Sequence, residues 1–152
     1  MKVLFVCTGN TCRSCMAEAI FNQLSDMENI KAYSAGISVV SGSKTSKNTA
    51  TLIKSNFNLD ISERNAVQLT EEMIKESDLV LTMTAYMRDV LSQKFFQEKN
   101  KIYTLNEFIG LSDDIVDPYG GNINIYEETF YMLNRGIELL LDKIKEDSGK
   151  LY

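Results

Sequence analysis

The sequence contains no histidine among its 152 residues. Without an imidazole, a general acid or base that acts near neutral pH must be a carboxylate, a cysteine, a lysine or a tyrosine. A tetrahedral zinc site would also need carboxylate ligands, because the chain offers only three cysteines. We therefore expect no metal site, and the sequence indicates no other cofactor.

Cysteine is scarce and confined to one stretch, where Cys7, Cys12 and Cys15 lie close together. An odd and clustered set excludes the disulfide framework of a small secreted protein. Long hydrophobic runs are also missing. The longest apolar run near the N-terminus, residues 3–7, is too short for the core of a signal peptide or for a membrane span. We expect a cytoplasmic protein with no membrane partner.

An excess of positive charge is absent too, because 21 acidic residues outweigh 16 basic ones and leave a net charge of −5. A chain with this charge has no general affinity for nucleic acid or for anionic lipid. Its length fits one domain over residues 1–152 and suffices to bury a hydrophobic core without disulfides or metals. We expect a single-domain monomer.

Segments with strand-like and helix-like apolar patterns alternate along the chain. This alternation predicts an α/β fold: a single three-layer domain, with a four-stranded parallel sheet and helices on both faces. Strands are predicted at residues 2–7, 30–37, 78–83 and 101–105. Helices are predicted at about 14–25, 48–57, 85–95 and 125–144, with a further short helix after an N-cap at Thr70.

The first strand ends at Cys7, and ligands of parallel α/β sheets bind beyond the carboxyl ends of strands. The connection from this strand to the first helix, residues 7–14, is therefore the expected site, and we call it the phosphate loop. Gly9 and Asn10 tolerate positive φ, so the turn can be tight and can point several N–H groups inward at an anion. Arg13 adds a planar fork that matches phosphate oxygens. The predicted phosphate-binding residues are Thr8, Gly9, Asn10, Thr11, Cys12, Arg13 and Ser14.

Cys7 is the candidate nucleophile of this loop. A helix N-terminus and a nearby guanidinium stabilise a thiolate, which is the reactive form of cysteine. The hydroxyl of Ser14 can donate to the sulfur and assist it as a leaving group. The predicted chemistry is covalent: the thiolate attacks phosphorus, and water then hydrolyses the phosphocysteine. The alternative is a buried turn of a nucleotide-binding domain in which Cys7 is only a core residue.

The two other cysteines have separate expectations. Cys12 lies in the same loop and can form a disulfide with Cys7 under oxidation, which would protect the nucleophile from irreversible oxidation. It can equally be a small packing residue at the start of the helix, and the sequence leaves both possibilities open. Cys15 follows Ser14 and is expected to be a packing residue.

The proton donor is expected in the loop at residues 112–122, which we call the acid loop. It holds the single proline of the chain, Pro118. With no histidine available, a carboxylate here is the natural acid, and Asp117 is the candidate. The run Asp117-Pro118-Tyr119-Gly120 equally fits a type I turn that needs no catalytic role. Tyr119 is either a cover over the core or a wall of the substrate cleft.

Taken together, these segments resemble the low molecular weight protein tyrosine phosphatase family over essentially the whole chain. The resemblance implies that Cys7 is the nucleophile, that Asp117 is the general acid, and that the substrates are phosphorylated proteins. It further implies that Arg13 clamps the phosphate, that Ser14 is a partner of the thiolate, and that Asn10 and Ser34 hydrogen-bond to hold the loop. The segments that carry it are residues 3–14, Met16-Ala17-Glu18, Ser34-Ala35-Gly36, Leu81-Thr82-Met83 and Asp117-Pro118-Tyr119-Gly120.

Within that family the chain looks most like the bacterial protein arginine phosphatases. Thr11 stands where tyrosine phosphatases usually have a larger aliphatic residue. Tyr119 is a single aromatic where many have two, and Met83-Thr84 replaces the common Met-Asp. A smaller side chain with a hydroxyl at residue 11 would make room for a planar guanidinium and direct the attacking water. The resemblance implies phosphoarginine as the substrate, with phosphotyrosine as the alternative.

The chain also departs from the family pattern. Cys15 replaces the usual proline, and Arg64 and Val67 stand where many relatives have a histidine and an arginine, which puts that part of the supporting network in doubt. Two rival functions remain. Arsenate reductases share the loop but need further cysteines downstream, and none follows Cys15. A binding module would hold phosphorylated partners without turning them over.

Overall fold

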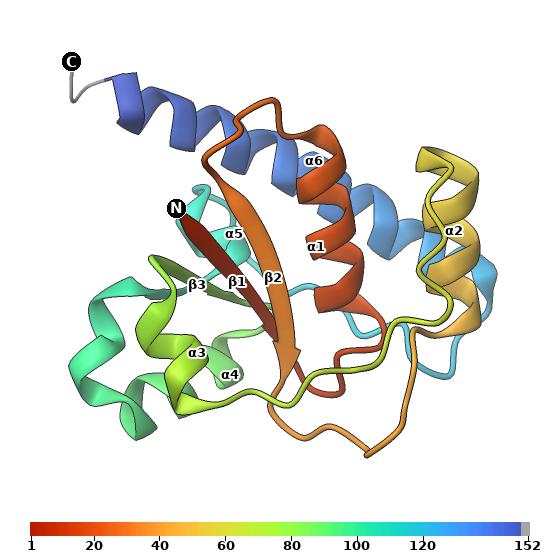
Figure 1. Cartoon of the computed structure of the whole chain (residues 1–152), viewed down its shortest axis with the longest axis horizontal. Helices are drawn as coiled ribbons and strands as arrows, with labels where there is room; N and C mark the ends of the chain where they lie inside the picture. Colours follow the sequence, from red (N-terminus) through yellow and green to blue (C-terminus); the bar gives the residue numbers. More distant parts are fainter. Residues whose placement is uncertain (150–152) are drawn as a thin grey trace.

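The computed structural model describes residues 1–149 and is shown in Figure 1. The end of the predicted domain, residues 150–152, lies outside the described residues. In chain order the elements are β1 (Lys2–Cys7), α1 (Arg13–Leu24), β2 (Lys31–Gly36), α2 (Lys47–Phe57), α3 (Glu71–Glu76), β3 (Leu79–Thr82), α4 (Ala85–Lys94), the 3₁₀ helix η1 (Phe96–Lys101), β4 (Ile102–Thr104), α5 (Leu105–Phe108) and α6 (Ile123–Gly149).

The four strands form one parallel sheet in the order β2-β1-β3-β4. Cys7, at the end of β1, is in register with Gly36 of β2, and Val6 is in register with Thr82 of β3. Because the strands run in the same direction, their carboxyl ends meet at one edge of the sheet. In Figure 1, β1 and β2 end at this edge near the start of α1. The fold therefore places the phosphate loop where parallel α/β sheets bind ligands.

The two faces of the sheet are covered by different helices, and β1 shows why. Successive side chains of a strand point to opposite faces. Phe5 and Cys7 belong to the larger core, which includes side chains from α1, α2 and α6, whereas Leu4 and Val6 belong to a smaller core with side chains from α3 and α4. All of these β1 side chains are buried, as expected for a central strand covered on both sides.

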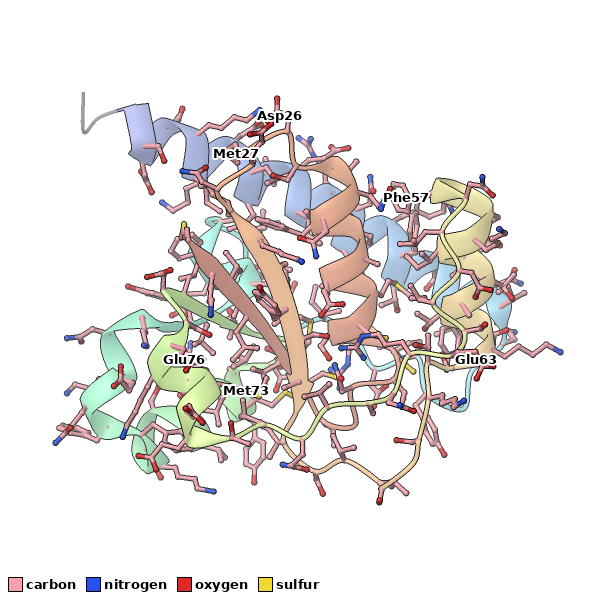
Figure 2. The ribbon with its side chains drawn as sticks, viewed as in Figure 1. Asp26, Met27, Phe57, Glu63, Met73 and Glu76 are labelled. Carbon is pink, nitrogen blue, oxygen red and sulfur yellow. The ribbon has the colours of Figure 1, made fainter. Side chains whose placement is uncertain are left out.

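Helix α6 forms the long wall of the larger core. Its buried side chains recur at helical spacing, with Leu133, Ile137, Leu140 and Ile144 on one stripe. Figure 2 shows Phe57, at the end of α2, beside this helix, and its ring lies 6.1 Å from that of Phe130. Asp26 and Met27, in the turn after α1, lie beside the other end of α6 in the same view, and Lys145 pairs with Asp26 at 2.9 Å.

The predicted three-layer α/β fold with four parallel strands is confirmed. Strand and helix limits differ from the prediction by at most one residue, except that α6 is longer, at residues 123–149 instead of 125–144. The predicted N-cap at Thr70 is present, because its hydroxyl accepts from the N–H of Met73 at 3.2 Å. Two short elements, η1 and α5, were not predicted. Each spans six residues or fewer, too short to show a clear periodicity in the sequence.

No helix within the described residues is long and apolar enough to cross a membrane.

Candidate active site

The phosphate loop leaves β1 at Cys7 and enters α1 at Arg13, one residue earlier than predicted. The Sγ atom of Cys7 lies 2.7 Å from Oγ of Ser14 and accepts from the backbone N–H of Asn10 at 3.2 Å. Only 3% of Cys7 is exposed. The loop therefore curls back so that its two ends hold one sulfur atom, with α1 starting behind it.

Backbone carbonyls of this loop are hydrogen-bonded to the neighbouring segment. The carbonyls of Cys7 and Thr8 accept from the N–H groups of Ile37 and Ser38, both at 2.9 Å, and that of Thr11 accepts from Ser46 at 3.0 Å. Among the residues that the structure describes, the N–H groups of Gly9, Thr11 and Cys12 have no hydrogen-bond partner. With its carbonyls held from outside and several amides free, the loop has the donor pattern of an anion-binding nest.

Close approach of β2 to the loop requires a glycine at the end of that strand. A Cβ atom on Gly36 would lie 2.6 Å from the carbonyl oxygen of Thr8 and 3.0 Å from the backbone nitrogen of Asn10. Both neighbours are backbone atoms, so a side chain here would displace the loop itself. The Gly36 position is thus explained by packing against the phosphate loop.

Asn10 is the centre of the network that supports the loop. It adopts the left-handed conformation, with φ +58°, whereas Gly9 does not, so of the two residues expected to allow the turn it is the asparagine that makes it. Its amide donates to Ser14 Oγ at 2.8 Å and to Ser34 Oγ at 3.0 Å. Its side-chain oxygen accepts from the backbone N–H of Val67 at 2.9 Å. Asn10 is fully buried, and both ends of its side chain are paired.

Arg64 is a supporting residue that the sequence reasoning missed. It comes from the segment after α2, and its guanidinium donates to Asn10 Oδ1 at 3.0 Å and to Ser34 Oγ at 2.8 Å. The same guanidinium pairs with Glu18 of α1 at 3.4 Å. Val67 takes part through its backbone N–H alone, so its side chain gives no signal in the sequence. From the sequence, Arg64 is only a departure from the family pattern.

The fold brings Arg13 and Asp117 together from distant parts of the chain. One guanidinium nitrogen of Arg13 donates to the carbonyl of Ile115 at 2.9 Å, and the other lies 3.6 Å from a carboxylate oxygen of Asp117. Arg13 is buried, whereas the side chain of Asp117 is 51% exposed. The predicted type I turn over residues 117–120 is wrong, because the backbone hydrogen bond of the turn runs from the N–H of Gly121 to the carbonyl of Pro118 at 2.8 Å, with Gly120 at φ +80°. Asp117 instead closes a side-chain turn by accepting from the N–H of Tyr119 at 3.0 Å. The carboxylate thus closes a turn and also faces the phosphate loop.

A cavity of about 450 Å³ opens above the phosphate loop. Asp117 and Tyr119 line it from the acid loop, while Ser14 and Ser34 lie behind the loop instead of in the cavity wall. Tyr119 is largely exposed at the rim, which makes it a wall of the cleft and not a cover over the core. Side chains that the sequence did not indicate complete the lining from the segment after β2: Ser38, Val40 and Ser43.

All three cysteines are free thiols. Cys12 is buried, and its sulfur lies 3.4 Å from the hydroxyl of Tyr126 on α6. Burial, followed by the hydrogen bond to Cys12, raises the pKa of Tyr126 to about 12. Cys15 is fully buried and donates to the carbonyl of Cys12 at 3.3 Å. Burial raises the pKa of the Cys15 thiol far above its ordinary value, which fits the expected packing role.

Within residues 1–149, no group of three or more cysteine, aspartate or glutamate side chains is arranged to hold a metal ion.

Comparisons with known proteins cover nearly the whole chain. The sequence model of the family described as "Low molecular weight phosphotyrosine protein phosphatase" matches residues 2–150. A protein-arginine-phosphatase of Bacillus subtilis is 37% identical over 97% of this chain and 99% of its own length. The low molecular weight protein-tyrosine-phosphatase PtpB of Staphylococcus epidermidis is 36% identical over 95% of this chain and 97% of its own length.

A solved structure gives the same result for the fold. It is described as the YwlE arginine phosphatase, a C7S mutant with a phosphorylated active-site serine. It superposes with a TM-score of 0.90 at 33% identity and covers 97% of each chain. By sequence and by fold, the chain belongs to the low molecular weight phosphotyrosine protein phosphatase family, which confirms the enzyme class, a protein phosphatase, that the phosphate loop predicts.

Proposed function

We propose that this protein removes phosphate from phosphorylated side chains of proteins through a phosphocysteine on Cys7. The observation that carries the proposal is the setting of the Cys7 sulfur, 2.7 Å from the Ser14 hydroxyl and 3.2 Å from the Asn10 N–H. Two donors beside a sulfur stabilise its anionic form, and the N-terminus of α1 acts in the same direction. A core cysteine without chemistry needs neither donor.

The first step transfers the phosphoryl group to the enzyme. Free loop amides and the Arg13 guanidinium bind the three non-bridging oxygens, which places phosphorus above the Cys7 sulfur. The thiolate attacks, so that a sulfur–phosphorus bond forms as the bond to the leaving group breaks. Asp117, facing the cavity 3.6 Å from Arg13, gives its proton to the departing atom.

The second step frees the enzyme. A water molecule gives a proton to the Asp117 carboxylate and attacks phosphorus, and the bond to Cys7 breaks. Ser14 donates to the departing sulfur and so stabilises the thiolate that re-forms. The phosphorylated serine in the C7S mutant of a relative supports a covalent intermediate of this kind.

The proposed substrate is protein phosphoarginine, with phosphotyrosine as the alternative. Thr11 lines the cavity above the loop, where its short side chain leaves room for a planar guanidinium. In its acid form Asp117 gives its proton to the leaving nitrogen, and the carboxylate that results can pair with the guanidinium as it departs. The relative from Bacillus subtilis named as an arginine phosphatase supports this choice, and the one named as a tyrosine phosphatase supports the alternative.

The proposal also covers the extent of the catalytic domain, the cellular location and the oligomeric state. The family match over residues 2–150 supports one catalytic domain that spans the chain, 1–152. A role of Cys12 as the oxidation partner of Cys7, the cytoplasmic location, the monomeric state and the lack of a nucleic-acid partner stay predictions from the sequence.

Turnover of phosphoarginine and phosphotyrosine peptides by wild type and by Thr11→Ile tests the substrate. We expect wild type to prefer phosphoarginine by about tenfold in kcat/KM. Thr11→Ile replaces the hydroxyl by an ethyl group and should shift the ratio towards phosphotyrosine by at least about tenfold, because even one methylene in a pocket has an effect of this order. Thr51→Ile, on the exposed side of α2, is the matched control. Identical ratios for wild type and Thr11→Ile would exclude Thr11 as the selectivity determinant.

A further inference from the structure

Asn106 lies behind the acid loop, at the second position of α5, with only 7% of its surface exposed. Its side-chain amide donates to the backbone carbonyl of Asp113 at 2.9 Å and to that of Ser112 at 3.4 Å. Its own backbone carbonyl accepts from the N–H of Leu111 at 2.8 Å. One buried residue thus holds Leu111 and the first two residues of the acid loop, Ser112 and Asp113.

The position that Asn106 holds most closely is a strained one. Asp113 has a left-handed backbone, with φ +71°. This conformation costs a residue with a side chain of the order of 1 kcal/mol, and it persists only when the surroundings fix it. The amide of Asn106 supplies such a fixed donor for the Asp113 carbonyl, so the sharp turn of the chain at this point depends on it.

Two more hydrogen bonds fix the chain between Asp113 and the proposed acid, Asp117. Asp114 accepts from the N–H of Ala85 at 2.8 Å, and Ile115 donates to the carbonyl of Met83 at 2.9 Å. Beyond them, within the described part of the chain, the backbone of residues 116–120 makes no hydrogen bond to any other segment. The backbone path that brings Asp117 over the cavity is therefore set by the anchored stretch before it and by α6 after it, while its side chain pairs with Arg13 at 3.6 Å.

Helix α5, which carries Asn106, is held in place by its capping box and by packing. Thr104 and Glu107 form a reciprocal capping box at its start, and Leu105 is fully buried. The helix contacts β3, β4 and α6, and Figure 1 shows it beside the sheet. A donor on this helix keeps a constant place relative to the sheet, and hence relative to the phosphate loop at the end of β1.

We infer that Asn106 is a positioning residue for Asp117: it fixes the start of the acid loop so that the carboxylate meets the leaving group. The inference rests on the proposed role of Asp117 as general acid. Loss of the two donated hydrogen bonds would release the turn at Asp113 and let the carboxylate drift, while the phosphate loop stays intact. Misplacement by about 1 Å can slow a reaction by about 100-fold.

A pair of aryl phosphates separates this role from a general loss of stability. Phenyl phosphate has a basic leaving group that needs the acid, whereas p-nitrophenyl phosphate leaves as a stabilised anion and needs it much less. The measured quantity is the ratio of kcat/KM for the two substrates on the same preparation. This ratio does not depend on how much of the protein is folded, because both rates scale with the same active fraction.

The variants are Asn106→Leu, of similar size but without donors, and Asn106→Asp, of the same outline but able only to accept. For both we expect kcat/KM for phenyl phosphate to fall about tenfold more than kcat/KM for p-nitrophenyl phosphate. Asn100→Leu, an exposed site before β4 and at the opposite edge of the sheet, is the matched control and should keep the wild-type ratio.

Asp117→Asn is the reference variant and should show the same selective loss at larger size. If Asp117→Asn shows it and both Asn106 variants keep the wild-type ratio, the inference is overturned while the proposed function stands. If wild type hydrolyses neither substrate, or if Asp117→Asn leaves the ratio unchanged, it is the proposed function that fails.

Discussion

The phosphate loop and the acid loop face the same cavity, yet they are held in different ways. The phosphate loop is tied on every side: its carbonyls accept from the segments after β2, and its central side chain, Asn10, is fully buried with both ends paired. The acid loop is held mainly at its start, where Asn106, Asp114 and Ile115 make hydrogen bonds. Beyond that point Asp117 pairs with Arg13 and Pro118 is buried, but the other residues as far as Tyr119 are exposed.

This difference matches the two tasks proposed for the loops. The phosphate loop must keep its donors fixed around an anion, since donors that need no reorganisation stabilise a transition state best. The acid loop must admit a protein side chain and release the product, which favours few contacts and high exposure. The comparison predicts that changes in the phosphate loop affect binding, chemistry and stability together, whereas changes in the acid loop affect chemistry alone.

The largest effect is expected for Cys7→Ser. A serine hydroxyl is not ionised by the donors that stabilise a thiolate, so turnover of phenyl phosphate should fall by more than about 1,000-fold. Cys15→Ser is the matched control, because its hydroxyl can still donate to the Cys12 carbonyl and it does not line the cavity. Steady-state rates under reducing conditions measure both. Near wild-type turnover by Cys7→Ser would refute covalent catalysis at residue 7.

Asn10→Ala tests whether the network that holds the phosphate loop also contributes to the stability of the fold. It removes a buried side chain that joins Ser14, Ser34, Arg64 and Val67 and leaves their polar groups unpaired. We expect the free energy of unfolding to fall by about 3 kcal/mol, as for other losses from a buried hydrogen-bond network. Denaturant unfolding measures it.

The same unfolding measurement on Asn106→Ala tests the comparison between the loops. Asn106→Ala is expected to cost less stability than Asn10→Ala, because Asn106 makes fewer side-chain bonds and the carbonyls that it releases lie next to exposed loop residues. Equal losses for the two variants would show that the acid loop is held as firmly as the phosphate loop and would remove the contrast.

Much of this arrangement can be read from the sequence, because it depends on local patterns. The run of apolar residues 2–7 and the pattern Cys7-x5-Arg13-Ser14 predict a strand, a tight turn and a helix, and the structure shows all three. That the turn binds an anion stays a prediction. Ser46, Thr84 and Thr104 follow the same logic as Thr70, since each caps a helix with its own side chain. Chemistry encoded within a few residues is visible without a structure.

What the sequence does not reveal are contacts between distant segments. Arg64 meets Asn10 across 54 positions, and Ser38 and Val40 reach the cavity only because β2 lies beside β1. Asn106 resembles any polar residue of a short helix until the acid loop folds over it. Such roles follow from tertiary packing, and no periodicity or spacing in a single sequence records them.

The smallest expected effect is on the stability of α5, the helix behind the acid loop. The backbone N–H of Thr104 lowers the pKa of Glu107, and Arg88, at 3.0 Å, acts in the same direction, although partial burial opposes them. A carboxyl whose pKa is lower in the folded state stabilises the fold above its unfolded pKa, and the stabilisation is lost as the pH falls through the folded value. Glu107→Gln, which keeps an acceptor but cannot ionise, should therefore be less stable than wild type near neutral pH, by about 0.5 kcal/mol for so exposed a pair.

As the pH falls below about 4, this difference in the free energy of unfolding should shrink towards zero, because wild type then carries a protonated carboxyl as well. Urea unfolding of both proteins at neutral and acid pH measures it, with Glu146→Gln on the exposed side of α6 as the matched control. A difference of the same size at both pH values would mean that the charge on Glu107 contributes nothing. The hydrogen bond from the backbone N–H of Thr104 would then be the only contribution of the Glu107 side chain to the stability of α5 in the described structure.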